Sequence, residues 1–438
     1  MGLLPCPLPW HGQKDEESQS ESNSKHLDSD SSISSSLSSQ PSLPSVPSLT
    51  SFSSQQQGQQ MTEVDHQCLA TLKGQSSYVS SLALSGKFLY SGSSNSEMRV
   101  WKRDPNSLLE KSSHGNKLAT GNGAVKSIVV LGEKLFSAHQ DHKIRVWRID
   151  NRNISHNYDC LATLPTRKDC FLKFFSEKNY VQVRRHKKCT WVHHVDTVST
   201  LAISRDGSLL YSASWDRTFK VWRTSDFSCL ESAKNAHDDA INAIVLSNDG
   251  FVYTGSADKK IKVWKKYIAG DKKHSLVETM EGHRSAVNAL ALSTDGSVLY
   301  SGACDRSILV WERDSGAEAN INGGGHMVLA GALRGHTKAI LCLAVVSDIV
   351  CSGSADSIVR IWKRGLEKSY SCLAVLEGHR RPVKCLTAAI DTNDGRGSSD
   401  SGTSYLVCSG SLDCDIKIWH IWVPVLYHSN KLYEKMRN

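Results

Sequence analysis

The stretch YSGACDRSILVW, residues 300–311, decides the fold because it recurs along this 438-residue chain with small changes. Each copy contains a short apolar strand, a tight turn that carries Asp, and a second strand with alternating apolar positions before Trp. The seven copies end at Trp101, Trp147, Trp222, Trp264, Trp311, Trp362 and Trp419. Such repetition predicts one supersecondary unit used seven times.

Two further strands complete each repeat. One precedes the block, as in AVNALALS at 286–293, and one follows it, as in CLAVLEGH at 372–379. Four antiparallel strands repeated around an axis leave only short, protected sheet edges. The sequence therefore predicts an all-β, seven-bladed propeller.

The ring needs a closing strand. CLATLKG at 68–74 matches the strands between repeats, although no blade precedes it, so we expect it to complete the last blade. The competing candidate for that outer position is HIWVPVLY, from His420 to Tyr427.

The repeats resemble the WD-repeat family in their Gly-His pairs, such as Gly282/His283, and in an Asp that stands six residues before Trp in six of the seven copies. The literal Trp-Asp dipeptide is absent from the repeat ends. The resemblance implies buried structural tetrads that join His, Ser or Thr, Asp and Trp. The five complete sets are His194/Ser212/Asp216/Trp222, His237/Thr254/Asp258/Trp264, His283/Ser301/Asp305/Trp311, His336/Ser352/Asp356/Trp362 and His379/Ser409/Asp413/Trp419.

The first two repeats depart from this pattern. Gln75 and Gly121 stand where the His belongs, and Asn95 replaces the first Asp. We expect these blades to be less firmly joined. Because the Ser, His and Asp set recurs five times and an enzyme needs one such set, we expect no enzymatic activity, no catalytic residue and no cofactor.

Composition divides the chain into a tail and a body. Residues 1–62 are rich in Ser and acidic up to Gln60, so we expect a disordered tail that suits phosphorylation. We expect the propeller over 63–425 and a C-terminal tail over 426–438. The net charge of +8 leaves about +12 for the body, which favours acidic partners.

Cysteine spacing and hydropathy give no signal for a metal site or a membrane span. The thirteen cysteines form no CxxC pairs, which indicates a reduced compartment and no metal site. No apolar stretch approaches the roughly 20 residues that span a bilayer. We expect the protein in the cytoplasm, the nucleus or both.

Three segments interrupt the repeats. The insertion at about 165–192 carries eight Lys or Arg against two acidic residues, and it predicts an extra hairpin with a basic turn at Arg184, Arg185, Lys187 and Lys188. That turn could be merely solvated, contact a protein or phosphopeptide, or contact nucleic acid. The polar stretch at about 391–403 and the Gly-rich 321–327 are expected to be flexible connections.

Propellers of this kind bind partners on the face that carries the Asp turns, which we call the top face. The expected contact positions are Lys126, Gln140, Trp215, Asn242, Asn288 and Lys384. Among them Trp215 stands out, because the equivalent residues Ala257, Cys304 and Ala355 are small. An aromatic residue beside basic groups suits an acidic, partly apolar peptide.

The Ser-rich leader, CLATLKG, CLATLPT followed by NYVQVRRHKK, and the HIWVP ending resemble the plant JINGUBANG-like group of WD-repeat proteins. This resemblance implies a monomeric regulator that binds partner proteins, including transcription factors, in plant development. Two alternatives remain. The chain could be a substrate receptor of a ubiquitin ligase, or a nucleic-acid-associated adaptor that uses the basic insertion.

Overall fold

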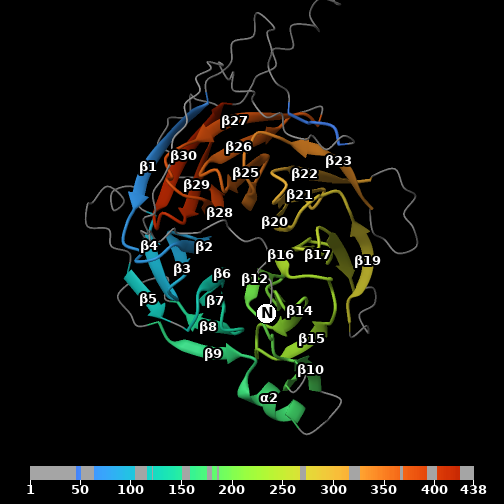
Figure 1. The fold of residues 1–438 in the computed structure, drawn as a ribbon. Coiled ribbons are helices and arrows are strands. Elements are labelled where there is room, and N and C mark those ends of the chain that lie inside the picture. Colours follow the sequence, from blue (N-terminus) through green and yellow to red (C-terminus); the bar gives the residue numbers. More distant parts are fainter. Residues whose placement is uncertain are drawn as a thin grey trace, which may run out of the picture.

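Seven four-stranded antiparallel sheets surround a central axis in the computed structural model (Figure 1). The structure describes residues 46–50, 64–103, 116–120, 122–149, 158–174, 180–184, 187–266, 273–314, 326–365, 368–391 and 402–424. The all-β, seven-bladed propeller predicted from the repeats is confirmed.

The first four blades follow chain order from the innermost strand outward. Blade 1 contains β2 (Val79–Ser85), β3 (Phe88–Ser93), β4 (Glu97–Lys102) and β5 (Asn116–Thr120). Blade 2 contains β6 (Val125–Leu131), β7 (Lys134–His139), β8 (Ile144–Arg148) and β9 (Cys160–Leu164). Blade 3 contains β12 (Val198–Ile203), β13 (Leu209–Ser214), β14 (Phe219–Arg223) and β15 (Cys229–Ala233). Blade 4 contains β16 (Ile241–Leu246), β17 (Val252–Ser256), β18 (Ile261–Lys265) and β19 (Ser275–Met280).

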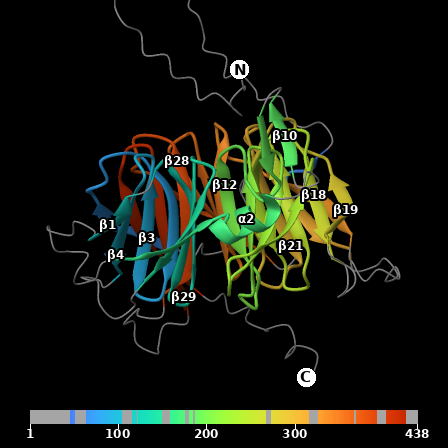
Figure 2. The same cartoon turned by 90° about the horizontal axis from the view of Figure 1, so that it is seen from below.

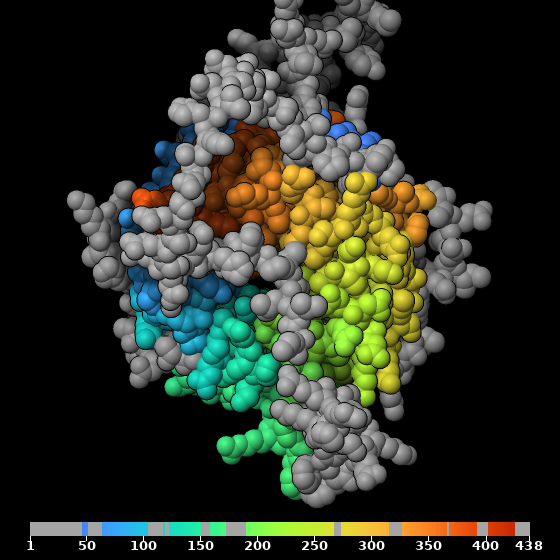
Figure 3. Space-filling model, in the orientation of Figure 1, coloured from blue at the N-terminus to red at the C-terminus, as the bar shows by residue number. Residues whose placement is uncertain are grey.

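The remaining blades complete the ring, which is coloured in chain order in Figure 3. Blade 5 contains β20 (Val287–Leu292), β21 (Val298–Ala303), β22 (Ile308–Arg313) and β23 (Met327–Leu333). Blade 6 contains β24 (Ile340–Val346), β25 (Ile349–Ser354), β26 (Val359–Arg364) and β27 (Tyr370–Leu376). Blade 7 contains β28 (Val383–Ile390), β29 (Gly402–Ser411), β30 (Ile416–Pro424) and, outermost, β1 (Asp65–Leu72).

The N-terminal strand closes the ring, as CLATLKG predicts. β1 pairs antiparallel with β30, and Cys68 lies opposite Trp419. The competing segment from His420 instead extends β30 to Pro424, between β29 and β1, and residues 425–427 lie outside the described residues. The last blade is therefore built from both ends of the propeller sequence.

Apolar side chains fill the space between neighbouring blades. Tyr253 and Val263 of blade 4 pack in one buried cluster with Leu290, Leu299 and Trp311 of blade 5. Strand alternation places these residues on facing sheet surfaces. Burying one such side chain stabilises the fold by about 1.5–3 kcal/mol, so the contacts between blades hold the ring together.

The structure describes one short part of the N-terminal tail. Residues 1–45 and 51–63 lie outside the described residues, but Val46 to Thr50 lie against the propeller through bridges from Ser48 to Ala332 and from Thr50 to Tyr370. These five residues, which lie within the tail predicted over 1–62, thus have a defined place on the outer edge of the propeller. The reason is local, because Val46 and Leu49 bring apolar side chains that pack against buried clusters.

The insertion contains the expected hairpin and also a helix that the sequence prediction missed. Strand β10 (Tyr180–Arg184) pairs with β11 (Lys187–Thr190), while α2 (Arg167–Phe174) lies on the flank of the ring (Figure 2). Thr166 caps the helix, since its Oγ1 accepts a hydrogen bond from the Asp169 N–H at 3.1 Å.

The other predicted connections and the predicted C-terminal tail fall largely outside the residues that the structure describes. Residues 392–401 of the polar connection, 321–325 of the Gly-rich connection and the whole predicted C-terminal tail, 426–438, lie outside the described residues. Over the ranges described, no helix is long and apolar enough to cross a bilayer.

Candidate functional site

Each of blades 3 to 7 contains a hydrogen-bonded tetrad of the expected residues. In blade 5, His283 lies between Asp305 (Nδ1 to Oδ2, 2.9 Å) and Ser301 (Nε2 to Oγ, 2.8 Å). Trp311 donates its indole N–H to the same Ser301 Oγ at 2.9 Å. The same arrangement, with distances of 2.8–2.9 Å, joins His194/Ser212/Asp216/Trp222, His237/Thr254/Asp258/Trp264, His336/Ser352/Asp356/Trp362 and His379/Ser409/Asp413/Trp419.

The central hydroxyl of every tetrad is enclosed within its blade. Ser301 is buried with 0% exposure, and its four equivalents are buried to the same extent: Ser212 in blade 3, Thr254 in blade 4, Ser352 in blade 6 and Ser409 in blade 7. A hydroxyl without solvent exposure cannot meet a substrate or a partner protein. These five hydroxyls therefore have the buried structural role that the resemblance to WD repeats implies, and they do not belong to a contact surface. The physical reason is that the buried indole N–H and the imidazole both need an internal partner.

The Asp of the tetrad also has a structural role. Burial opposes ionisation of Asp305, but hydrogen bonds from His283, Ser307 and the Arg284 N–H outweigh it and hold the pKa of Asp305 at about 2. The Asp carboxylate thus fixes the loop before the inner strand to the turn that follows β21.

Blade 1 replaces the histidine with an amide. Gln75 donates from Nε2 to Ser91 Oγ at 2.7 Å, and Trp101 donates to the same oxygen at 2.8 Å. Asn95 takes the Asp position and donates to Ser76 Oγ at 2.6 Å. The buried Gln75 Oε1 has no hydrogen-bond partner, so this blade is less completely satisfied than blade 5.

Blade 2 recruits a histidine that the spacing argument missed. His139 lies on β7 itself, and its Nε2 is 2.8 Å from Ser137 Oγ, which also accepts from Trp147 at 2.8 Å. The nearby Asp141 instead pairs with Arg145 at 2.5 Å. Burial, aided by Arg145, lowers the pKa of His139 to about 4. The sequence signal that could have identified His139 is its position, at which five other repeats carry Ser.

The residue before each turn Asp forms a ring of equivalent positions on the top face. The backbone N–H of Trp215 donates to Thr197 O at 3.0 Å, and the same contact recurs in the other blades. The seven residues are Ser94, Gln140, Trp215, Ala257, Cys304, Ala355 and Leu412. Trp215 is the largest of them and is partly buried, while Gln140 is exposed.

A second ring lies on the innermost strands, at the residue after the first apolar one. Asn242 donates from Nδ2 to Val287 O of the next blade at 3.0 Å, and Asn288 donates to Ile340 O at 2.8 Å. Ser199 makes the same contact with Ile241 O at 2.6 Å. Two of the expected contact residues, Asn242 and Asn288, thus join neighbouring blades.

Lys126 and Lys384 occupy this inner position in blades 2 and 7. The Lys126 ammonium lies 5.3 Å from the centre of the Trp215 ring, which is a cation–π distance. Burial lowers the pKa of Lys126 to about 8, and the charge of Lys384 adds to this effect. Three of the six expected positions therefore form one group, which we call the channel-mouth cluster: Lys126, Trp215 and Lys384.

The basic insertion leads into blade 3, the blade that carries Trp215. Arg184 ends β10 and Lys187 and Lys188 begin β11, while Arg185 lies outside the described residues. Among the described residues, no group of three or more His, Cys, Asp or Glu could hold a metal ion.

Comparison with known proteins agrees with this geometry. The family model "WD domain, G-beta repeat" matches residues 66–102, 186–223, 228–265, 274–312, 327–363 and 370–420. The chain belongs to the WD-repeat family. The matched spans leave out the whole of blade 2, the WD repeat in which His139 replaces the usual histidine. Proteins of this family typically act as interaction scaffolds and are typically not enzymes.

Two plant WD-repeat relatives illustrate the similarity. The Arabidopsis thaliana Protein ROOT INITIATION DEFECTIVE 3 is 31% identical over 187 residues, which are 39% of this chain and 40% of that protein. The Arabidopsis thaliana Autophagy-related protein 16 is 26% identical over 204 residues, 45% of this chain and 36% of that protein. The chain thus spans well under half the length of each relative.

Proposed function

We propose that this WD-repeat protein is a non-enzymatic scaffold that binds acidic or phosphorylated segments of partner proteins at the channel-mouth cluster. The observation that carries the proposal is the contact between Lys126 and Trp215 with Lys384 nearby. An aromatic ring in contact with one ammonium group, whose charge a second lysine reinforces, offers both apolar contact and positive charge.

Electrostatics support an anionic ligand. Lys126 is partly buried and is repelled by Lys384, which together bring its pKa to about 8. A carboxylate or phosphate bound between the two lysines would neutralise that repulsion and raise the pKa of Lys126 again. Binding should therefore weaken as the pH rises through about 8, and it should weaken with added salt.

The wider role follows from resemblance. The sequence features shared with the JINGUBANG-like group support a regulator in the nucleus or cytoplasm that binds transcription factors in plant development. The similarity to a plant relative whose name refers to root initiation supports a role in development.

The test compares three full-length proteins carrying an affinity tag: the native chain, a Trp215→Ala/Lys384→Glu variant and a Lys102→Glu control. Lys102 is exposed at the end of β4, away from the top face. Partners identified by affinity purification and mass spectrometry are then purified, and their affinities are measured by calorimetry. We expect the double variant to lose at least about 10-fold in affinity while the control does not. Unchanged affinity for every purified partner, with the fold intact, would overturn the proposal.

A further inference from the structure

The five residues Val46 to Thr50 add a short parallel strand to the outer edge of blade 5. The Ala332 N–H donates to Pro47 O at 3.0 Å, and the Leu49 N–H donates to Ala332 O at 3.0 Å. Leu49 O then accepts from the Tyr370 N–H of blade 6 at 3.0 Å. This segment, the short blue stretch beside β23 in Figure 1, therefore spans the seam between the two outermost strands β23 and β27.

Two apolar side chains of the segment find separate hydrophobic surfaces. Val46 packs against the buried cluster that contains Met327 and Ala332, and Leu49 packs against the cluster that contains Tyr370. Pro47 and Ser48 between them are exposed. Backbone pairing combined with apolar anchors is the usual basis of peptide recognition by strand addition.

Gly331 makes this edge accessible. A Cβ atom there would lie 2.5 Å from Leu49 Cγ and 2.8 Å from Pro47 O, which is too close for either contact. The residue paired with the position before the repeat Trp is Gly in blade 5 alone. The other six blades carry Ala70, Asn116, Ala162, Glu231, Glu278 and Ala374 at this position.

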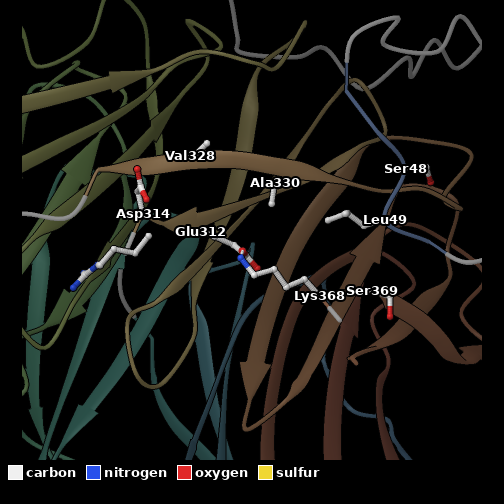
Figure 4. Close-up of a pocket in the computed structure, with 9 residues that line it drawn as sticks. Ser48, Leu49, Glu312, Asp314, Val328, Ala330, Lys368 and Ser369 are labelled. Atoms are coloured by element: carbon white, nitrogen blue, oxygen red, sulfur yellow. Dashed lines mark ion pairs between the residues drawn. The ribbon is translucent and has the colours of Figure 1, made fainter. Parts of the chain in front are cut away.

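The seam is also larger than the segment that occupies it. A cavity of about 570 Å³ adjoins Ser48 and Leu49 and is lined by Glu312, Lys368 and neighbouring residues (Figure 4). At this end Glu312 pairs with Lys368 Nζ at 2.5 Å and with Arg364 at 2.6 Å. A longer extended ligand therefore has room to continue beyond the segment.

We propose that this seam is a docking site for extended peptides of the form apolar-Pro-Ser-apolar, and that residues 46–50 occupy it as a tethered ligand. A partner segment of the same chemistry would displace them. The tail contains Pro-Ser followed by an apolar residue three times, at 41–43, 44–46 and 47–49, and the full pattern twice, in LPSV at 43–46 and VPSL at 46–49. This site is separate from the channel-mouth cluster and does not depend on its function.

The test uses a labelled peptide of residues 44–52, PSVPSLTSF, and full-length protein. A tethered ligand acts at an effective concentration near the millimolar range, so the native chain should bind the peptide weakly. A Val46→Ser/Leu49→Ser variant should bind it at least about 10-fold more tightly. A control peptide carrying the same two serines should not bind.

Gly331→Ala in the Val46→Ser/Leu49→Ser chain should reduce peptide binding at least about 10-fold, because the added methyl occupies the position of the ligand. Ala162→Ser at the equivalent site of blade 2 is the matched control, and thermal melts check that each variant folds. The proposal fails if the unblocked chain does not bind the peptide, if the native chain binds it equally well, or if Gly331→Ala leaves binding unchanged. The Trp215→Ala/Lys384→Glu variant separates the two sites, since it should retain the seam.

Discussion

Blades 3 to 7 and blades 1 and 2 solve the same problem with different residues. In all seven, a buried Ser or Thr hydroxyl accepts the indole N–H of the repeat Trp. Five blades complete the chain with His and Asp, whereas blade 1 uses Gln75 and blade 2 uses His139 from its own strand. The comparison teaches that the fold requires a second partner for the hydroxyl, and that the identity of this partner can vary.

The largest expected effect tests what all blades share. Ser301→Ala would leave the Trp311 N–H and His283 without a buried partner, and Ser91→Ala would do the same to Trp101 and Gln75. Each variant should lower the free energy of unfolding by about 3 kcal/mol, since an unsatisfied buried group costs about 1–3 kcal/mol. Urea unfolding measures both losses. If they differ by more than about 1 kcal/mol, the hydroxyl is not an equivalent centre in the two kinds of blade.

The second effect is a pH dependence specific to blade 2. His139 has a pKa of about 4 in the folded chain against an ordinary 6.5, so the unfolded chain binds its proton first as the pH falls. The contribution of neutral His139 to the free energy of unfolding is fully present above pH 6.5. It declines by up to roughly 3 kcal/mol as the pH falls from 6.5 to 4. His139→Gln should flatten that decline in unfolding experiments at several pH values. An unaltered slope would show that His139 is not held neutral.

The third effect contrasts the Asp position between complete and incomplete blades. Asp305→Ala or Asp356→Ala should cost about 1–3 kcal/mol, because each releases a buried His and a loop N–H. Asn95→Ala should cost less than about 1 kcal/mol, since Asn95 is exposed. Equal losses in thermal melts would remove the distinction between the blades.

The smallest effect would repair blade 1. Gln75→His combined with Asn95→Asp restores the residues of a complete tetrad and removes the unpaired Gln75 Oε1. We expect a gain of up to about 1 kcal/mol in the free energy of unfolding. Neither single change should achieve it, because each leaves one half of the His–Asp pair without its partner. A double variant less stable than the native chain would show that the first blade is adapted to its amide.

The repeat predicts most of the fold, because each copy carries its own strands, turn and Trp. The five complete tetrads follow from the resemblance to WD repeats together with the constant spacing of Ser or Thr, Asp and Trp within each repeat, whereas the His precedes the Ser or Thr by 16 to 30 residues. This argument does not predict His139, because that residue lies inside strand β7, where five other repeats carry Ser, and Gly121 stands at the usual loop position. Helix α2 escapes it too, although Thr166 followed three residues later by Asp169 is a recognisable cap.

The seam could not be predicted from local pattern. Val46 and Leu49 lie in a serine-rich stretch whose composition indicates disorder, and the groups that bind them belong to strands almost 300 residues later. The role of Gly331 becomes clear only when the strand pairing of blade 5 is compared, residue by residue, with that of the other six blades. Lys126 and Trp215 were each singled out from the sequence, but their mutual contact depends on how blades 2 and 3 meet.

The pairing of β1 with β30 has a consequence for synthesis of the protein. Strand β1 leaves the ribosome early, and its partner follows about 350 residues later. At roughly 5–20 residues per second, the first strand waits about 20–70 s before the last blade can form. During that interval the nascent chain is an open arc of blades with two unpaired sheet edges. We expect aggregation and the need for chaperones to depend mainly on these two edges.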